Sequence, residues 1–450
     1  MIEQQTGSAK KKFGFWSIVL LGFNGIVGSG IFLLPGKAFA LFGPATIAVF
    51  AVSALIALIF ALNFAEAAGK FDRHGASYLY AREAFGEFVG FEVGLLGWAI
   101  RIIAWSAMAV GFATALSAIV PAVADPFYKN IVAVGVLVGL GIINYLGVNI
   151  TRVFNNVLTV AKLTPLLMFI LIGIFFVQAP NYSPALPAAG FTWDAFGATV
   201  LLVFYAFTGF EALAVAAGDL ENPRKNIPKA LIAVLILTSI IYILVQTVAV
   251  GTLGANLAKS TAPIADAATV FLGGWGKWLV TLGALISIAG INVAASFEVP
   301  RGVVALAQDG LFPRVLASQS KYNTPHLAIL LTVLFAIPVA ASGSFTQLAA
   351  ISVISRFIQY IPTFIAVLIF RKTRPDANAF RIPFGPVVPV LAVLISAWLL
   401  TKATTVQLQW GFGALAIGVP LYFAFKLLDK STYKNSQASQ GAQTNQTIAN

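Results

Sequence analysis

The chain alternates long apolar runs with short polar connections. A helix needs about 20 mostly apolar residues to cross the hydrocarbon core of a bilayer, and runs of this kind recur from residue 13 to residue 426. The pattern predicts an all-α integral membrane protein. Its twelve predicted spans are centred near residues 26, 56, 106, 139, 168, 206, 241, 293, 334, 359, 393 and 418.

Composition agrees with lipid as the main solvent. Hydrophobic residues make up 59% of the 450 positions and charged residues 10%, against roughly a quarter charged in ordinary soluble domains. The ends are polar, so we expect disordered tails at residues 1–12 and 427–450 around one membrane domain at residues 13–426. Two connections, residues 75–90 and 257–277, are so apolar that we expect them at the interface or packed on the bundle.

The basic residues predict the direction of the spans. An even number of spans puts both tails on one side, and cytoplasmic loops of membrane proteins are enriched in Lys and Arg. Cytoplasmic tails place 20 of the 28 basic residues inside, five outside and three within spans. The enrichment of basic residues in cytoplasmic segments therefore explains the net charge of +12, and no nucleic-acid-binding surface is needed. We expect a multi-pass protein of the plasma membrane with both termini in the cytoplasm.

Residues that the sequence lacks exclude several function classes. It has no cysteine, and its two histidines, His74 and His326, lie far apart at loop positions. We therefore expect no disulfide, metal site or cofactor, and no enzyme activity, because no HExxH spacing or nucleophile with a base is visible. No GxxxxGK[ST] loop is present, so ATP does not drive the protein directly.

Two predicted spans are interrupted by glycine. The first contains a Gly-Ser-Gly run at positions 28–30, and the sixth contains a Thr-Gly pair at positions 208–209 beside Glu211. Glycine weakens a helix, and unwound backbone at membrane depth is tolerated only against protein or a wet cavity. The alternative is an unbroken helix that packs closely on a neighbour through Gly25 and Gly28, or through Gly22 and Ser29.

The two interruptions occupy corresponding places in two sets of five spans. That arrangement is typical of inverted-repeat transporters, which bind substrate between the broken helices. It predicts a 5+5 inverted repeat with discontinuous first and sixth helices. Repeat one covers residues 13–180 and repeat two residues 190–372, and the eleventh and twelfth helices at 385–426 are peripheral. A channel is less well supported, because its filter is normally built from several subunits or repeats around a pore.

Six short motifs resemble the amino acid–polyamine–organocation permeases. They occur in order along residues 13 to 426, which makes the resemblance specific for the family, although not for a substrate. The motifs are GSGIF at 28–32, GASY at 75–78, REAFG at 82–86, FTGFE at 207–211, ENPRKNIP at 221–228 and ALAQDGLFP at 305–313.

The resemblance implies where a substrate binds. Backbone amides and a hydroxyl at positions 28–30 would hold its carboxylate, and carbonyls near positions 26, 27, 204 and 207 would hold its amino group, in agreement with the helix dipoles. Tyr205 and Thr208 would line the side-chain pocket, with ordinary packing as the alternative for Tyr205. The implied set is Ile26, Val27, Gly28, Ser29, Gly30, Phe204, Tyr205, Phe207, Thr208 and Gly209.

Charged side chains within spans are functional candidates, because they are costly in lipid. Lys162 in the fifth span could snorkel to the interface. The resemblance instead places it where sodium sits in sodium-coupled relatives, where an ammonium would brace the broken first helix. Arg101 in the third span could select a carboxylate, although an ion pair with Glu211 or Glu298 is favoured. Together Lys162, Arg101 and Glu211 are the candidate coupling or gating residues.

Three other charged residues lie near the cytoplasmic ends of spans. Glu66 is at the end of the second, Glu298 in the eighth and Arg356 in the tenth, and we expect them to anchor or gate. The whole pattern predicts a sodium-independent secondary amino-acid transporter that works by alternating access, as a proton symporter or an exchanger. Its substrate is predicted to be neutral or acidic, and an amine or polyamine exchanger of the same fold is the alternative.

Overall fold

The described structure is helical. It is a computed structural model that describes residues 14–71, 76–147, 152–187, 190–215, 221–375 and 380–448. Within these ranges helices dominate and no strand occurs. The all-α prediction is therefore confirmed, and the apolar helices fit an integral membrane protein.

Seven helical stretches are long and apolar enough to cross a membrane. One of them, Pro35–Ala68, joins two helices, so the number of stretches is not a number of spans. The stretches contain α3 (Pro35–Phe42) with α4 (Thr46–Ala68), α6 (Glu87–Leu116), α7 (Pro126–Tyr145), α11 (Pro223–Leu253), α12 (Pro263–Gln308), α14 (Phe345–Thr373) and the first half of α16 (Thr405–Ile448).

Other apolar helices are shorter, at 10–17 residues. The first predicted span is divided between α1 and α2, which is why length alone does not identify it. The count of twelve spans stays a prediction. These apolar helices are α1 (Phe15–Ile26), α8 (Arg152–Gly173, from Val160 onward), α9 (Trp193–Phe204), α13 (His326–Ser342) and α15 (Val387–Leu400). The remaining described α-helices are α2 (Ser29–Leu33), α5 (Ala76–Phe85) and α10 (Ala212–Val215).

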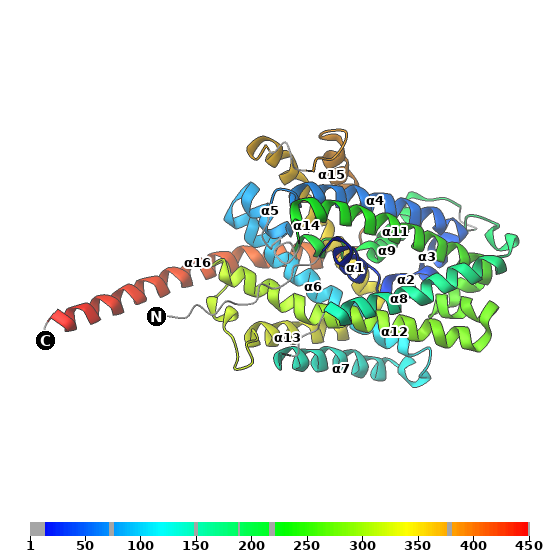
Figure 1. Ribbon diagram of the computed structural model, residues 1–450, viewed down its shortest axis with the longest axis horizontal. Helices are drawn as coiled ribbons and strands as arrows, with labels where there is room; N and C mark the ends of the chain where they lie inside the picture. Colours follow the sequence, from blue (N-terminus) through cyan, green and yellow to red (C-terminus); the bar gives the residue numbers. More distant parts are fainter. Residues whose placement is uncertain are drawn as a thin grey trace.

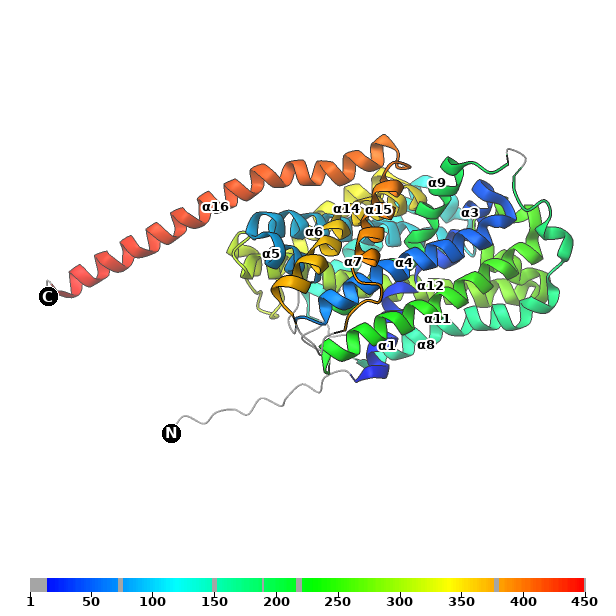
Figure 2. The ribbon, with the colours of Figure 1, turned by 90° about the horizontal axis from the view of Figure 1, so that it is seen from above.

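The helices pack into one bundle around α6 and the broken first helix (Figures 1 and 2). α6 packs against α12, α14, α7 and α13, and α4 packs along α11. α1 lies between α11 and α8. The core of the bundle is apolar and aromatic, and Trp105, Phe60 and Phe204 are among its fully buried side chains.

α16 extends well beyond the bundle in both views (Figures 1 and 2). The segment after residue 426 is predicted to be a disordered tail, but the described backbone stays helical to Ile448. Residues 428–448 contain no proline and a single glycine, and Ala, Gln and Lys are tolerated well in helices. No proline interrupts a continuation of α16 through that segment.

α12 bends near its start. Gly273 has φ 62° and ψ −155°, which separates a short arm at residues 263–272 from the long helix that follows. Leu257 and Ile264, on either side of the start of this arm, are buried. The apolar connection at residues 257–277 thus packs partly on the bundle, while Trp275 and Trp278 are exposed.

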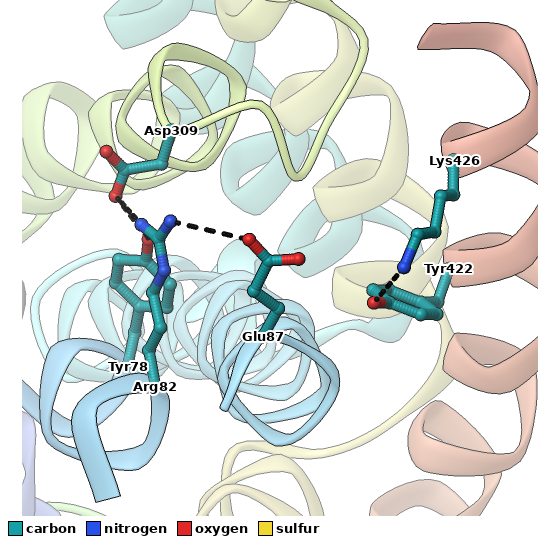
Figure 3. A network of polar contacts seen from close by, with 6 residues as sticks. All are labelled: Tyr78, Arg82, Glu87, Asp309, Tyr422 and Lys426. Carbon is teal, nitrogen blue, oxygen red and sulfur yellow. Dashed lines mark hydrogen bonds and ion pairs between the residues drawn. The ribbon is translucent and has the colours of Figure 1, made fainter. Parts of the chain in front are cut away.

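The other apolar connection forms α5, which docks on the bundle through Tyr78, Leu79 and Tyr80. Figure 3 shows the polar side of this contact. The Tyr78 hydroxyl donates a hydrogen bond to the Asp309 carboxylate, and Arg82 lies 3.3 Å from the same carboxylate. Burial, and then the hydrogen bond to Asp309, raise the pKa of Tyr78 above its ordinary value, so the hydroxyl keeps its proton.

Candidate functional site

The first break separates α1 from α2 in the middle of the first predicted span. α1 ends at Ile26, Val27 is extended with φ −75° and ψ 101°, and Gly28 has φ −142° and ψ −145°. Two non-helical residues interrupt the hydrogen-bond ladder, so carbonyls at the end of α1 and amides at the start of α2 lose their helix partners. Ser29 and Gly30, which begin α2, are buried.

Lys162 of α8 binds the carbonyls that this break frees. Its ammonium donates to the carbonyl oxygens of Val27 at 2.8 Å and Asn24 at 3.0 Å. The side chain is 0% exposed. Lys162 therefore points into the bundle and braces the end of α1, and it does not snorkel to the interface.

Two hydroxyl groups also donate to this turn of α1. Ser287 of α12 lies 3.2 Å from the carbonyl oxygen of Val27, and Tyr242 of α11 lies 3.3 Å from that of Ile26. A carbonyl oxygen has two lone pairs, so Val27 is fully occupied by Lys162 and Ser287. Of the two carbonyls implied to bind an amino group here, that of Ile26 keeps the spare capacity.

The second break follows α9. A 3₁₀ turn at Tyr205–Phe207 is succeeded by extended Thr208, with ψ 155°, and by Gly209, with φ 105°. The Thr208 hydroxyl donates to the Tyr205 carbonyl at 2.8 Å, and the Gly209 amide donates to Glu211 at 3.1 Å. The chain then resumes as α10. Glycine is required at 209, because side chains rarely adopt this positive φ.

The structure brings the two breaks into backbone contact. A Cβ built on Gly209 would overlap the carbonyl oxygen of Gly25, and one built on Gly30 would lie 2.7 Å from Ala206 Cα. No side chain separates the two backbone segments at these points. The glycines predicted to interrupt the helices therefore also allow them to approach each other.

Tyr205 closes one side of this contact. Its hydroxyl lies 3.5 Å from Ser29 Oγ, and its ring packs edge-on against Phe345 of α14, with centroids 5.6 Å apart. Gly111 of α6 completes the group, because a Cβ there would lie 3.2 Å from both Ser29 and Phe345. Tyr205 thus has a polar partner and a packing role together.

The two predicted phenylalanines contribute side chains to the core. Phe204 packs against Phe357 with ring centroids 4.9 Å apart, and Phe207 against Tyr242 at 5.2 Å. Both are fully buried. Any contribution of Phe204 and Phe207 to a ligand is therefore through their backbone.

Glu211 forms an ion pair with Arg356 of α14, both side chains being nearly buried. Of the two partners predicted for Arg101, Glu211 and Glu298, Glu211 is therefore wrong. Glu211 also accepts from the Gly209 amide, so the pair ties α14 to the second break. Sequence alone could not choose between the arginines, because it does not give the face of the helix on which each one lies.

Arg101 interacts electrostatically with Glu298, Arg356 and Tyr360. In the described part of the chain it forms no ion pair, either with Glu211 or with Glu298. The favoured interpretation of Arg101 as a paired, purely structural charge is thus not what the geometry shows. The Glu298 side chain is accessible at the surface of α12, with Arg101 and Arg301 as its charged neighbours.

Glu66 anchors the end of α4. Its two carboxylate oxygens each accept from Arg371 at 2.7 Å, and Oε2 also accepts from the Ile382 amide at 2.9 Å. A buried bidentate pair of this kind fixes the ends of two helices and the loop that follows. The predicted anchoring role of Glu66 agrees with these contacts.

Several site residues are not predictable from the sequence. Tyr242, Ser287 and Phe345 belong to unbroken spans, and similar hydroxyl and aromatic residues occur in every predicted span. Among the described residues, no group of three or more His, Asp or Glu side chains is placed to hold a metal ion. The assembled site therefore consists of freed backbone, an ammonium, hydroxyls and one ion pair.

The sequence matches a known family over nearly its full length. The amino acid permease family matches residues 13–423. Three relatives from Bacillus subtilis align over 93–94% of this chain: a branched-chain amino acid permease (29% identical, 93% of its length), a methylthioribose transporter (28%, 95%) and a serine/threonine exchanger (27%, 97%).

The match covers both breaks and every motif on which the resemblance rests. The relatives are permeases and transporters, and the helices are those of a multi-pass protein of the plasma membrane. The chain is thus a transport protein and not an enzyme, and it belongs to the amino acid permease family within the amino acid–polyamine–organocation superfamily.

Proposed function

We propose that the chain is a sodium-independent secondary transporter of amino acids that works by alternating access at the two breaks. The observation that carries the proposal is Lys162, whose ammonium occupies the carbonyls of Asn24 and Val27. A fixed cation at this place supplies the positive charge that a bound sodium ion would otherwise supply. Sodium would compete with a group that is already bonded.

The proposed ligand contacts follow the polarity of the breaks. Amides of Gly28, Ser29 and Gly30 lie at the start of α2, where the helix dipole favours a carboxylate. The carbonyl of Ile26 and those near Phe204 and Phe207 are left for the ammonium group. Thr208 and Gly209 supply the turn of the second break, and Tyr205 limits the room for the substrate side chain.

A neutral substrate side chain is favoured. A polyamine or other cation would need an unpaired acid at the breaks, and Glu211, the acid beside the second break, is neutralised by Arg356. The branched-chain amino acid permease and the serine/threonine exchanger among the relatives support a neutral amino acid. An acidic amino acid is the next candidate, because Arg101 is unpaired in the described structure. The amine or polyamine exchanger remains the alternative function.

The proposed topology has twelve spans with both termini in the cytoplasm. It is supported by the excess of basic residues on one side and by the positions of the apolar helices. The 5+5 repeat is supported by the equivalent positions of the breaks after α1 and after α9. The substrate site then lies between the repeats.

Uptake into proteoliposomes tests the function. A panel of labelled amino acids, with putrescine as the cationic competitor, is offered without sodium, with and without an inward proton gradient and with or without internal amino acid. We expect uptake of a neutral amino acid that sodium does not increase. A sodium requirement, or uptake of putrescine alone, would contradict the proposal.

The same vesicles separate the two coupling modes. Accumulation into empty vesicles that depends on the proton gradient establishes symport. Uptake that needs preloaded amino acid establishes exchange, and Lys162 is then a structural brace.

A further inference from the structure

A second polar cluster lies in the bundle beyond the two breaks. It consists of Arg101 from α6, Glu298 from α12, and Arg356 and Tyr360 from α14. α6 packs against both α12 and α14, so the cluster bridges the bundle interior. Arg101 interacts electrostatically with the other three side chains. Charged groups this deep in a span are rare without a function.

The cluster has hydrogen-bonding groups that nothing in the described structure uses. Tyr360 is fully buried and its hydroxyl has no partner, and Arg356 is 7% exposed with its Nε unpaired. Ser352 and Thr363, on the same face of α14, also carry unpaired hydroxyls. Buried polar groups are normally satisfied by protein, water or ligand. This row of polar groups on α14 is therefore available to hydrogen-bond with water or with a polar ligand.

The cluster combines charges of both signs. Arg101 and Arg356 are close enough to repel one another, and Glu298 attracts Arg101 without forming an ion pair with it. Two guanidinium groups that repel one another favour an anion near them. Glu298, exposed although ten residues from the end of α12, offers the complementary site for a cation.

The absence of a side chain at Gly302 of α12 leaves room for the Arg101 guanidinium. Gly302 follows Glu298 by one helical turn, and a Cβ built there would lie 3.0 Å from Arg101 Nη1. A larger residue at 302 would therefore displace the guanidinium. Arg301, the other charged neighbour of Glu298, is exposed and donates to the Phe297 carbonyl at 2.7 Å.

The cluster is continuous with the broken helices. Arg356 is paired with Glu211, which accepts from the Gly209 amide, and Arg356 also interacts electrostatically with Tyr205. A molecule leaving the breaks towards Tyr360 would meet this cluster next.

We propose that Arg101 and Glu298 form a second binding site for a zwitterionic amino acid on the cytoplasmic path to the breaks. The carboxylate binds Arg101, with the Tyr360 hydroxyl and Arg356 Nε beside it, and the ammonium binds Glu298. The site holds a substrate between the cytoplasm and the breaks. This inference rests on the proposed function, since it assumes an amino acid cargo and cytoplasmic termini.

Transport measured separately from each face tests the second site. Right-side-out and inside-out membrane vesicles carry the wild type, Arg101→Gln, Glu298→Gln, the double variant and Arg101→Lys. The probe is the labelled amino acid that the uptake panel selects. Lys321→Gln is the matched control, because it removes one positive charge from the exposed loop after α12.

We expect each single Gln variant to raise KM at the cytoplasmic face about tenfold, the loss typical of a bond to a charged group. KM at the external face should change less than about twofold. Each residue binds a different end of the ligand, so the two losses should multiply to about a hundredfold in the double variant. Arg101→Lys should raise this KM less than Arg101→Gln does, and Lys321→Gln should have the wild-type KM.

Three results would overturn the second site. The first is a double variant whose KM at the cytoplasmic face is no higher than that of either single variant. This would mean that Arg101 and Glu298 act only on each other, as a gate. The second is an equal shift of KM at both faces, and the third is no shift at all. Wild-type vesicles that carry no amino acid from either face would instead contradict the proposed function.

Discussion

The ammonium of Lys162 lies 2.8 Å from the carbonyl oxygen of Val27, the first non-helical residue of the broken first span. The contact joins α8 to the end of α1, and a second bond to Asn24 makes it bidentate. A buried cation here stabilises backbone that would otherwise face lipid-like surroundings without donors. The integrity of the break and the state of Lys162 are therefore linked.

Replacing Lys162 by Met should remove the donor while keeping much of the volume. The carbonyls of Asn24 and Val27 each lose a bond to a charged donor, while Val27 keeps its bond from Ser287. A hydrogen bond to a charged group contributes about 1.5–3 kcal/mol, so we expect a lower thermal unfolding temperature in detergent and loss of uptake. Leu171→Ala is the control, because Leu171 of the same helix is 67% exposed. An unchanged melting temperature for Lys162→Met would show that the brace does not support the break.

Adding one methyl group at position 209 should abolish uptake. The φ of 105° disfavours alanine, and its Cβ would overlap the Gly25 carbonyl oxygen. We expect Gly209→Ala to insert in the membrane but to lose substrate binding. Gly413→Ala is the matched control, since a Cβ there meets nothing within 4 Å in α16, and alanine should even favour the helix by up to about 1 kcal/mol. Normal transport by Gly209→Ala would refute the backbone contact.

Glu211 and Arg356 should depend on each other. Removing one partner of a buried ion pair leaves an uncompensated charge, at a cost of about 3–5 kcal/mol. We expect Glu211→Gln and Arg356→Gln each to destabilise the protein strongly. The double variant should lose less stability than the sum of the two single losses. Thermal unfolding of the four proteins completes the cycle. Strictly additive losses would mean that the pair is not formed in the membrane.

Asp309→Asn should loosen α5 without unfolding the bundle. The change weakens the contacts to Tyr78 and Arg82, but the carboxylate is 45% exposed, so we expect a loss below about 1 kcal/mol. Hydrogen exchange of residues 76–85 should accelerate. Glu87→Gln serves as the control, because its contact with Arg82 is 3.9 Å long and exposed. Equal exchange in both variants would contradict a docking role for Asp309.

The positions of the breaks could be predicted from the sequence because they depend on local chemistry. Glycines at 28, 30 and 209 act on their own backbone, so their effect is visible in a short stretch of sequence. The position of the Lys162 ammonium could not be predicted from the local sequence. Only the family resemblance distinguished a buried ammonium from one that snorkels to the interface.

Partners distant in the sequence could not be predicted. Tyr242 and Ser287 bond carbonyls that are 216 and 260 residues away. The sequence gives the approximate depth of a residue in a span, but not the neighbour that its helix face meets. The same limitation explains the wrong partner for Glu211, since Arg101 and Arg356 are equally available arginines until the helices are packed.

The contact between Tyr78 and Asp309 has a consequence for recombination among relatives. Residues 76–86 and 305–313 are two separate stretches of sequence, yet one hydrogen-bonded unit holds them together (Figure 3). A chimera that takes one stretch from each of two parents divides that unit, however similar the parents are elsewhere. The two stretches should therefore be inherited together, and crossover points between them should be tolerated only where both parents supply the same tyrosine, arginine and aspartate.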